Sequence, residues 1–235
     1  MYTPTKSAAL AAVLLGLFAA ASTTAIAAGI ADTKHNLSVT GTGTIKSTDQ
    51  TEICVFCHTP HDAIKNDNIP LWNHTLSSTA SYGTYASPTF NATDAADIGG
   101  VTEGTAAVSN LCLSCHDGTV AVNSMNNPSN ARPTTTMTGG SGAGSAFIPA
   151  GNSNLGTGAT ALKNDHPVNF TYDGALVTAD GGLKNPASLT GVKLFNNKVQ
   201  CASCHDPHTS QDPTGMAFLR VSMAGSTMCL ACHNK

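Results

Sequence analysis

The residues best suited to chemistry are the cysteines, because all eight fall in four copies of one motif, Cys-x-x-Cys-His. The thiols are Cys54 and Cys57, Cys112 and Cys115, Cys201 and Cys204, and Cys229 and Cys232. The histidines that close the motifs are His58, His116, His205 and His233. Sulfur and imidazole nitrogen are ligands for transition metals, so the motifs indicate a metal or a metal-containing group.

Cys-x-x-Cys-His is the attachment signature of c-type haem. Two thiols at this spacing can form thioethers with two vinyl groups on one porphyrin edge. The adjacent histidine is then carried beneath the ring, where its nitrogen ligates the iron. Four motifs that use every cysteine of the chain predict four covalently bound haem c groups.

Three other uses of paired cysteines account for the pattern less well. Structural zinc sites also use Cys-x-x-Cys pairs, but they do not require a histidine after every second cysteine. A disulfide framework suits an even number of cysteines in an exported chain, yet it leaves the four motif histidines unexplained. Thioredoxin-like chemistry needs a strand–helix setting and usually one motif.

Five histidines outside the motifs are candidates for the second axial position of each iron: His35, His61, His74, His166 and His208. Because they exceed the four predicted irons by one, bis-histidine ligation is possible at every site with one histidine left over. Methionine is the competing ligand. With histidines in surplus, we expect the methionines to pack against porphyrins instead, namely Met125, Met137, Met216, Met223 and Met228.

Short spacing constrains two of these histidines. Three residues span at most about 10 Å when fully extended, and Pro60 restricts the link from His58 to His61 further. His61 is therefore expected to ligate a different haem, the one on His116. The same reasoning assigns His208 to the haem on His233. His74 and His166 remain for the haems on His58 and His205, in an order that the spacing leaves open.

His35 stands apart, near the start of the expected mature chain, while the last motif ends two residues before the C-terminus. A free histidine at one end and a haem at the other would suit head-to-tail contact between copies, which produces rings or open filaments. A spare surface histidine is the alternative reading.

The N-terminus has the pattern of a secretory signal peptide. Lys6 precedes an apolar run from Ala8 to Ala21, and "AIA" at 25–27 suits a signal peptidase. We expect cleavage after Ala27 and an exported protein without a membrane span, since the run is shorter than the ~20 residues of an anchor. Removing Lys6 leaves 10 basic and 14 acidic residues, a net charge of −4, which gives no indication of nucleic-acid binding.

The composition predicts an unusual core. Aromatic residues make up 5% of the chain and charged residues 11%, so large side chains are too few to fill an ordinary interior. We expect a mostly irregular, haem-cored fold with few short helices, short strands in residues 36–47 and 166–177, and no extended sheet. The expected divisions are a signal peptide (1–27), a first haem module (28–128), a Gly/Ser/Thr-rich surface insert (129–160) and a second haem module (161–235).

The order "CVFCHTPH … PLWNH … LCLSCHDG … DHPV … CASCHDPH … CLACHNK" resembles multihaem cytochromes c with paired motifs, in particular the tetrahaem outer-surface cytochromes of metal-reducing bacteria. The resemblance implies bis-histidine haems stacked in a continuous chain, no catalysis, and head-to-tail polymerisation into an extracellular nanowire that passes electrons to external acceptors. It also implies that His35 completes a haem of a neighbouring subunit. A monomeric periplasmic shuttle for redox partner cytochromes and a multihaem reductase remain as alternatives.

Overall fold

The computed structural model describes residues 28–65, 71–101, 106–128, 135–209 and 218–234, and the predicted signal peptide lies outside them. The α-helices are α1 (Ala28–Ala31), α2 (Val108–His116), α3 (Gly174–Asp180), α4 (Cys201–Cys204) and α5 (Thr227–Leu230). The strands are β1 (Lys46–Ser47), β2 (Met137–Thr138), β3 (Phe170–Thr171) and β4 (Lys198–Val199). Single 3-10 turns are η1 (Cys54–Phe56), η2 (Ala143–Ser145), η3 (Pro186–Ser188) and η4 (Ala224–Ser226). The prediction of a mostly irregular chain without an extended sheet is confirmed for these residues.

The strands form two antiparallel pairs. Lys46 of β1 pairs with Thr138 of β2, and Phe170 of β3 pairs with Val199 of β4. Both regions expected to contain a strand therefore do so, but each strand is only two residues long. Asn169, directly before β3, has a positive φ of 62°. This is not an extended conformation, so the strand cannot begin earlier. Short pairs of this kind are stable only when neighbouring segments pack on them.

Helix α3 is bounded by a polar cap and by a glycine. In α3, the Asp173 carboxylate accepts a hydrogen bond from the Leu176 N–H (2.9 Å), which satisfies a free donor of the first turn. The helix ends at Gly181, whose φ of 72° is the left-handed conformation that glycine adopts without strain. No helix in the described part of the chain is long and apolar enough to cross a membrane.

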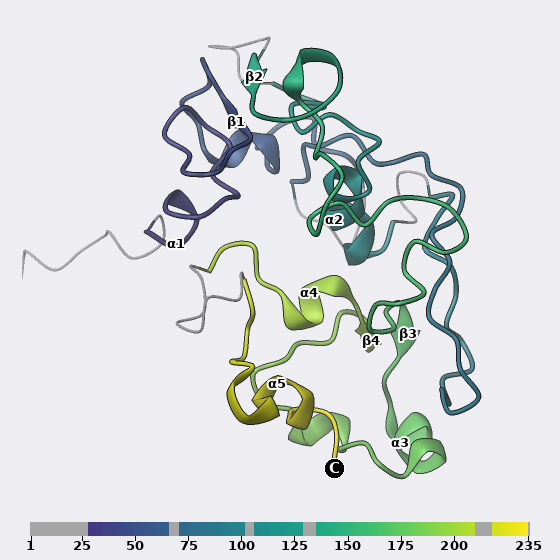
Figure 1. Ribbon diagram of the computed structural model, residues 1–235. Coiled ribbons are helices and arrows are strands. Elements are labelled where there is room, and N and C mark those ends of the chain that lie inside the picture. Colours follow the sequence, from purple (N-terminus) through teal and green to yellow (C-terminus); the bar gives the residue numbers. More distant parts are fainter. Residues whose placement is uncertain (1–27, 66–70, 102–105, 129–134, 210–217, 235) are drawn as a thin grey trace, which may run out of the picture.

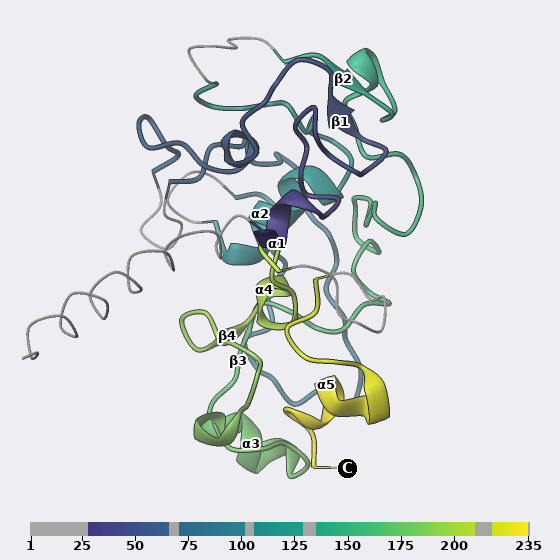
Figure 2. The same ribbon diagram turned by 90° about the vertical axis from the view of Figure 1, so that its left-hand side faces the viewer.

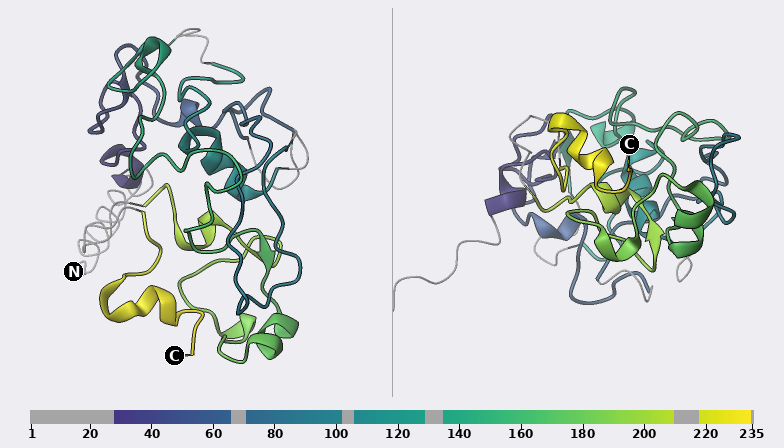
Figure 3. Two further views of the ribbon diagram at one scale, coloured as in Figure 1. Left: turned by 45° about the vertical axis from the view of Figure 1, so that its right-hand side comes forward. Right: turned by 90° about the horizontal axis from the view of Figure 1, so that it is seen from below.

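The elements are arranged along the length of the molecule (Figures 1 and 2). The β1–β2 pair lies at one end, α2 follows, α4 lies near the middle with β3 and β4, and α3 and α5 occupy the other end with the C-terminus. The views in Figure 3 place α3 and α5 at the same end of the molecule. Part of the predicted first module reaches this half, because Asp94 accepts hydrogen bonds from the Thr171 N–H and hydroxyl (2.9 and 2.6 Å).

Apolar burial is divided among three small clusters. Their fully buried members are Phe56, Val122, Met137 and Ala146; Tyr82, Ile98, Leu113 and Leu162; and Phe170, Tyr172, Leu176 and Val199. Cys57 and Cys115 pack against the first cluster and Cys232 against the third. The stretch expected as a surface insert supplies Met137 and Ala146 to the first cluster. Each apolar cluster is thus too small to be a domain core, and two of them adjoin motif cysteines.

A buried polar contact joins α2 to α4. The Gln200 side-chain carbonyl accepts hydrogen bonds from the Ser109 N–H (3.2 Å) and the Ser109 hydroxyl (2.5 Å). The Ser109 oxygen in turn accepts from the Cys201 N–H (2.9 Å). Both side chains are buried, so their polar atoms depend on each other rather than on water. This contact fixes the second motif relative to the third.

We expect Gln200→Met to destabilise the haem-loaded protein by about 2 kcal/mol, because it leaves the buried Ser109 donors without an acceptor while keeping the side-chain volume. Chemical denaturation measures the free energy of unfolding, with haem content first shown to equal that of the unaltered protein. Lys163→Met, at an exposed position, is the control and should change stability by less than about 0.5 kcal/mol. Equal stability of the two variants would refute the bridging role of Gln200.

Candidate haem sites

Each motif occupies one turn of helix. The histidine N–H donates to the carbonyl of the first cysteine in motifs one, three and four, at 2.8, 3.1 and 2.9 Å. The second motif forms the last turns of α2. Residues three and four positions apart lie on the same face of a helical turn. The two thiols and the imidazole of each motif therefore start from one face, as attachment to one porphyrin requires.

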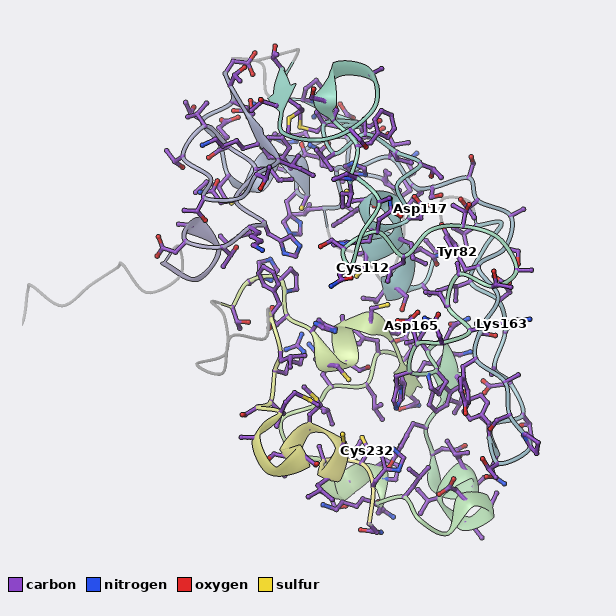
Figure 4. The ribbon with its side chains drawn as sticks, in the orientation of Figure 1. Tyr82, Cys112, Asp117, Lys163, Asp165 and Cys232 are labelled. Atoms are coloured by element: carbon purple, nitrogen blue, oxygen red, sulfur yellow. The ribbon has the colours of Figure 1, made fainter. Side chains whose placement is uncertain are left out.

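The four motifs follow one another in space in the order of the chain. Cys115 lies near Cys57, and burial first and then the neighbouring thiol raise the pKa of Cys115. The Cys201 thiol, which lies close to Cys112, and burial raise the pKa of Cys112. Cys204 lies near Cys232, and burial followed by this neighbour raises the pKa of Cys204. Figure 4 shows Cys112 near the middle of the molecule and Cys232 near the end that carries α5.

Asp117, directly after the second motif, is a buried anchor for His116. Its carboxylate accepts hydrogen bonds from the hydroxyls of Ser77, Tyr82 (2.7 Å) and Thr79 (3.0 Å), and from the Thr119 N–H (2.8 Å). Burial alone would raise the pKa of Asp117, but these hydrogen bonds outweigh it and lower the pKa. The ionised carboxylate thus holds segment 77–82 against the end of α2 (Figure 4).

The motif histidine of the second site has a defined ring orientation. Its Nδ1 lies 2.7 Å from the carbonyl oxygen of Ser153, to which an Nδ1–H can donate. A histidine that ligates a metal through one nitrogen commonly donates its other N–H to a carbonyl or carboxylate. This contact therefore leaves Nε2 of His116 as the ligating atom. Ser153 belongs to the expected surface insert, which thus contributes to the second site.

The structure brings two non-motif histidines beside motif histidines. The ring centres of His35 and His116 are 6.0 Å apart with planes at 77°, and those of His58 and His208 are 6.0 Å apart at 18°. Burial first, and then the charge of His116, lower the pKa of His35 to about 4, so this ring is unprotonated at neutral pH. An unprotonated ring keeps the lone pair that a metal ligand needs.

The other three candidates lie in different settings. His74 is buried, with Nδ1 2.8 Å from the Thr75 carbonyl and Nε2 3.4 Å from the Cys115 sulfur. His166 is exposed, with Nδ1 2.9 Å from the Pro167 carbonyl, which again leaves Nε2 for a ligand. His61 is exposed beside the first motif. The distances described do not test the expected assignments of His61, His74 and His166 to particular haems, which stay predictions.

The residues present fit c-type haem. All eight cysteines lie in described residues and are free thiols, so none is committed to a disulfide. Nδ1 of His35 and the indole N–H of Trp72 are buried, and neither has a hydrogen-bond partner among the described residues. The Trp72 ring lies edge-on to His58 at 6.2 Å. Buried polar atoms in native proteins normally have partners. An iron atom for His35 and a propionate oxygen for Trp72 would supply them. Haem would contribute reversible one-electron chemistry at these motifs.

Two acidic residues of the sites went unnoticed in the sequence. Asp117 and Asp206 each follow a motif histidine directly, and Asp206 contacts His208 and Arg220. Their shared position, directly after the histidines of the second and third motifs, could have indicated a role beside the haem sites. What the sequence could not indicate was the set of hydroxyl donors to Asp117, since Ser77, Thr79 and Tyr82 are distant from it along the chain.

A protein-family model described as a doubled CXXCH motif matches residues 194–235, which contain the third and fourth motifs. No curated protein matches the chain. The family match and the motif geometry together support a multihaem c-type cytochrome that binds haem covalently and carries electrons.

Blocking haem attachment should abolish the fold. We expect a variant with serine at all eight motif cysteines to show no cooperative thermal transition by circular dichroism, because three separate clusters cannot replace the missing haem contacts. The haem-loaded protein in the same buffer is the reference and should show a sigmoidal transition. A sigmoidal transition of the serine variant at a similar temperature would show that haem is not the core.

Proposed function

We propose that this chain is a tetrahaem c-type cytochrome that conducts electrons along a continuous series of haems. The observation that carries the proposal is the contact between consecutive motifs. Cys57 and Cys115 pack against the same apolar cluster, and the Cys201 N–H donates to Ser109 of α2, the helix that carries the second motif. A thioether sulfur lies at the edge of its porphyrin. Neighbouring sulfurs therefore favour close porphyrin edges, which suits transfer from one iron to the next.

The chemistry is one-electron transfer without a bound substrate. The motif cysteines and histidines would hold each haem, and the haems would supply reversible one-electron chemistry. The protein sets the spacing, the axial ligands and the solvent exposure of each haem. Bis-histidine ligation at every iron would leave no open position for a small molecule, which favours a carrier over a reductase.

We further propose export and assembly outside the cell. The signal-peptide pattern of residues 1–27 supports export. The order of motifs and flanking histidines resembles the outer-surface cytochrome OmcE, and this resemblance supports a filament of head-to-tail copies that receives electrons from partner cytochromes and delivers them to external acceptors. The propionates make the loaded protein more acidic than −4, so basic redox partners with salt-sensitive association fit its charge.

The number of haems is tested by mass and by pyridine haemochrome analysis. The mature protein should carry four haems, and serine at both cysteines of one motif, for example Cys229 and Cys232, should lower the count by one. Such a variant should lose about a quarter of the haem absorbance, since one attachment site of four is removed. A count other than four in the unaltered protein would contradict the tetrahaem proposal.

Assembly is tested by cryo-electron microscopy of the secreted fraction. Filaments with continuous haem density are expected, because a head-to-tail contact repeats without closing. Uniform monomers at high protein concentration would instead favour the periplasmic shuttle. A high-spin signal in the oxidised, fully loaded protein would indicate an open iron and favour a reductase.

A further inference from the structure

Two pairs of histidine rings share one separation. In each pair a motif histidine faces a non-motif histidine: His58 faces His208, and His116 faces His35, both with ring centres 6.0 Å apart. The inter-ring angles differ widely, at 18° and 77°. Ordinary ring packing allows centres about 4.5–7 Å apart at either angle, and Tyr85 and Phe90 have the same separation of 6.0 Å at 76°. What distinguishes the two histidine pairs is that each ring carries a metal-ligating nitrogen, so one metal atom between the rings is a possible spacer.

The separation matches that spacer. His35 and Phe218, which stack directly at 20°, have centres 4.2 Å apart. The nearly parallel His58–His208 pair is wider by 1.8 Å (6.0 minus 4.2). Two metal–nitrogen bonds of about 2 Å each, plus the distance from each nitrogen to its ring centre, amount to about 6 Å. Both pairs thus have the spacing of two imidazoles on opposite sides of one iron.

The surroundings of His208 orient its ring for this role. Its Nδ1 lies 3.3 Å from Oδ1 of Asp206, and its backbone N–H donates to the same oxygen at 3.1 Å. Arg220 holds the other carboxylate oxygen at 2.8 Å. A carboxylate at Nδ1 favours the proton on that nitrogen and leaves Nε2 as the ligating atom. The side chain is 63% exposed, so few protein contacts compete for it.

His35 is held in place by its own segment. The His35 N–H donates to the Thr33 hydroxyl at 3.2 Å, and the Asn36 side-chain amide donates to the Ala31 carbonyl at 2.8 Å. Phe218 stacks on one side of the ring. One ring nitrogen, Nδ1, is buried and has no hydrogen-bond partner in the part of the chain that the structure describes. The segment is therefore anchored within the same chain, and its ring retains an unsatisfied nitrogen near His116.

We infer that His208 is the second axial ligand of the haem on Cys54, Cys57 and His58, and that His35 is the second axial ligand of the haem on Cys112, Cys115 and His116. The assignment rests on covalent haem attachment at these two motifs and does not depend on filament formation. It differs from the pairing expected from spacing, which gave His208 to the fourth motif and the haem on His116 to His61. It also differs from the implication of the resemblance, which placed His35 between subunits.

Both bonds close long stretches of chain. His208 follows His58 by 150 residues (208 minus 58), and His35 precedes His116 by 81 (116 minus 35). The first haem is thereby tied to the third motif, whose short His–Asp–Pro–His link carries His208. The first site, in the first module, then needs a histidine from the second module to complete the ligation of its haem. With His35 used inside the chain, contacts between copies would not need it.

The test is a spectroscopic double-variant experiment on the full haem-loaded chain. His208→Ala should convert one haem from low-spin to high-spin in the oxidised protein, measured by electron paramagnetic resonance. In a background lacking the first site (Cys54→Ser with Cys57→Ser), His208→Ala should add no high-spin signal. In a background lacking the fourth site (Cys229→Ser with Cys232→Ser), it should still add one. Thr209→Ala, at the exposed neighbouring residue, is the control and should remain low-spin.

The His35 half is tested in the same way. His35→Ala should add one high-spin haem unless the second site is absent (Cys112→Ser with Cys115→Ser). This signal should appear equally in monomeric and filamentous fractions. A signal in filaments alone, or its persistence without the second site, would overturn the His35 assignment. A high-spin signal from His208→Ala that persists when the first site is removed would overturn the His208 assignment. If His208→Ala or His35→Ala leaves every haem low-spin, the assignment of that histidine is overturned.

Two further measurements separate ligand loss from misfolding. Added imidazole should return each alanine variant to low-spin, because it can occupy the open position, and a circular-dichroism spectrum equal to that of the unaltered protein should show that the fold is kept. If an alanine variant loses haem, methionine takes the place of alanine in the test. His208→Met should then give a histidine–methionine spectrum that is absent when the first site is removed. His35→Met should give one that is absent when the second site is removed. Survival of either spectrum in that background would refute the pairing. Haem counts on the same samples test the tetrahaem proposal separately.

Discussion

One turn of helix at each motif is the constraint on which the other features depend. The hydrogen bond from the motif histidine N–H to the first cysteine carbonyl fixes two thiols and one imidazole on a single face. Covalent attachment needs all three groups at one porphyrin, so this local geometry must form four times in the chain. Everything between the motifs has to deliver these turns to suitable distances and can otherwise remain irregular.

The connections between the turns explain why so little regular structure is needed. The α2–α4 contact is set by the buried pair Ser109 and Gln200, and the end of α2 is set by the Asp117 carboxylate with its hydroxyl donors. These are short polar contacts between distant segments rather than extended ladders. Small apolar clusters fill the spaces beside the motifs. Such an arrangement leaves the interior to haem and makes the order of the motifs in space a direct consequence of a few side chains.

This organisation relates position to electron transfer. Neighbouring thiols of consecutive motifs favour a series of adjacent porphyrin edges, and the proposed function uses that series as a path. The assigned ligands add a second effect, since a histidine from one part of the chain would bind the iron held by another. Axial ligation would then both stabilise the low-spin state and hold the path together, so the spacing that serves electron transfer would also support folding.

The sequence was sufficient for the motif chemistry, because the spacing Cys-x-x-Cys-His depends only on residues within one turn. It also predicted an irregular fold, because a chain with few aromatic residues and frequent glycine cannot build long helices or sheets. The strands were predicted in the correct regions but not at their length, which depends on breaks such as Asn169. The roles of Asp117 and Asp206 were missed, although their position after a motif histidine could have indicated them.

The sequence by itself determined which residues can attach haem, since that chemistry is local. Only the tertiary structure decided which histidines face each other, because His35 and His208 reach the rings of His116 and His58 across 81 and 150 residues of chain. Spacing along the chain excludes some short connections but cannot choose among long ones. That choice depends on how buried contacts such as those of Gln200 and Asp117 place distant segments side by side.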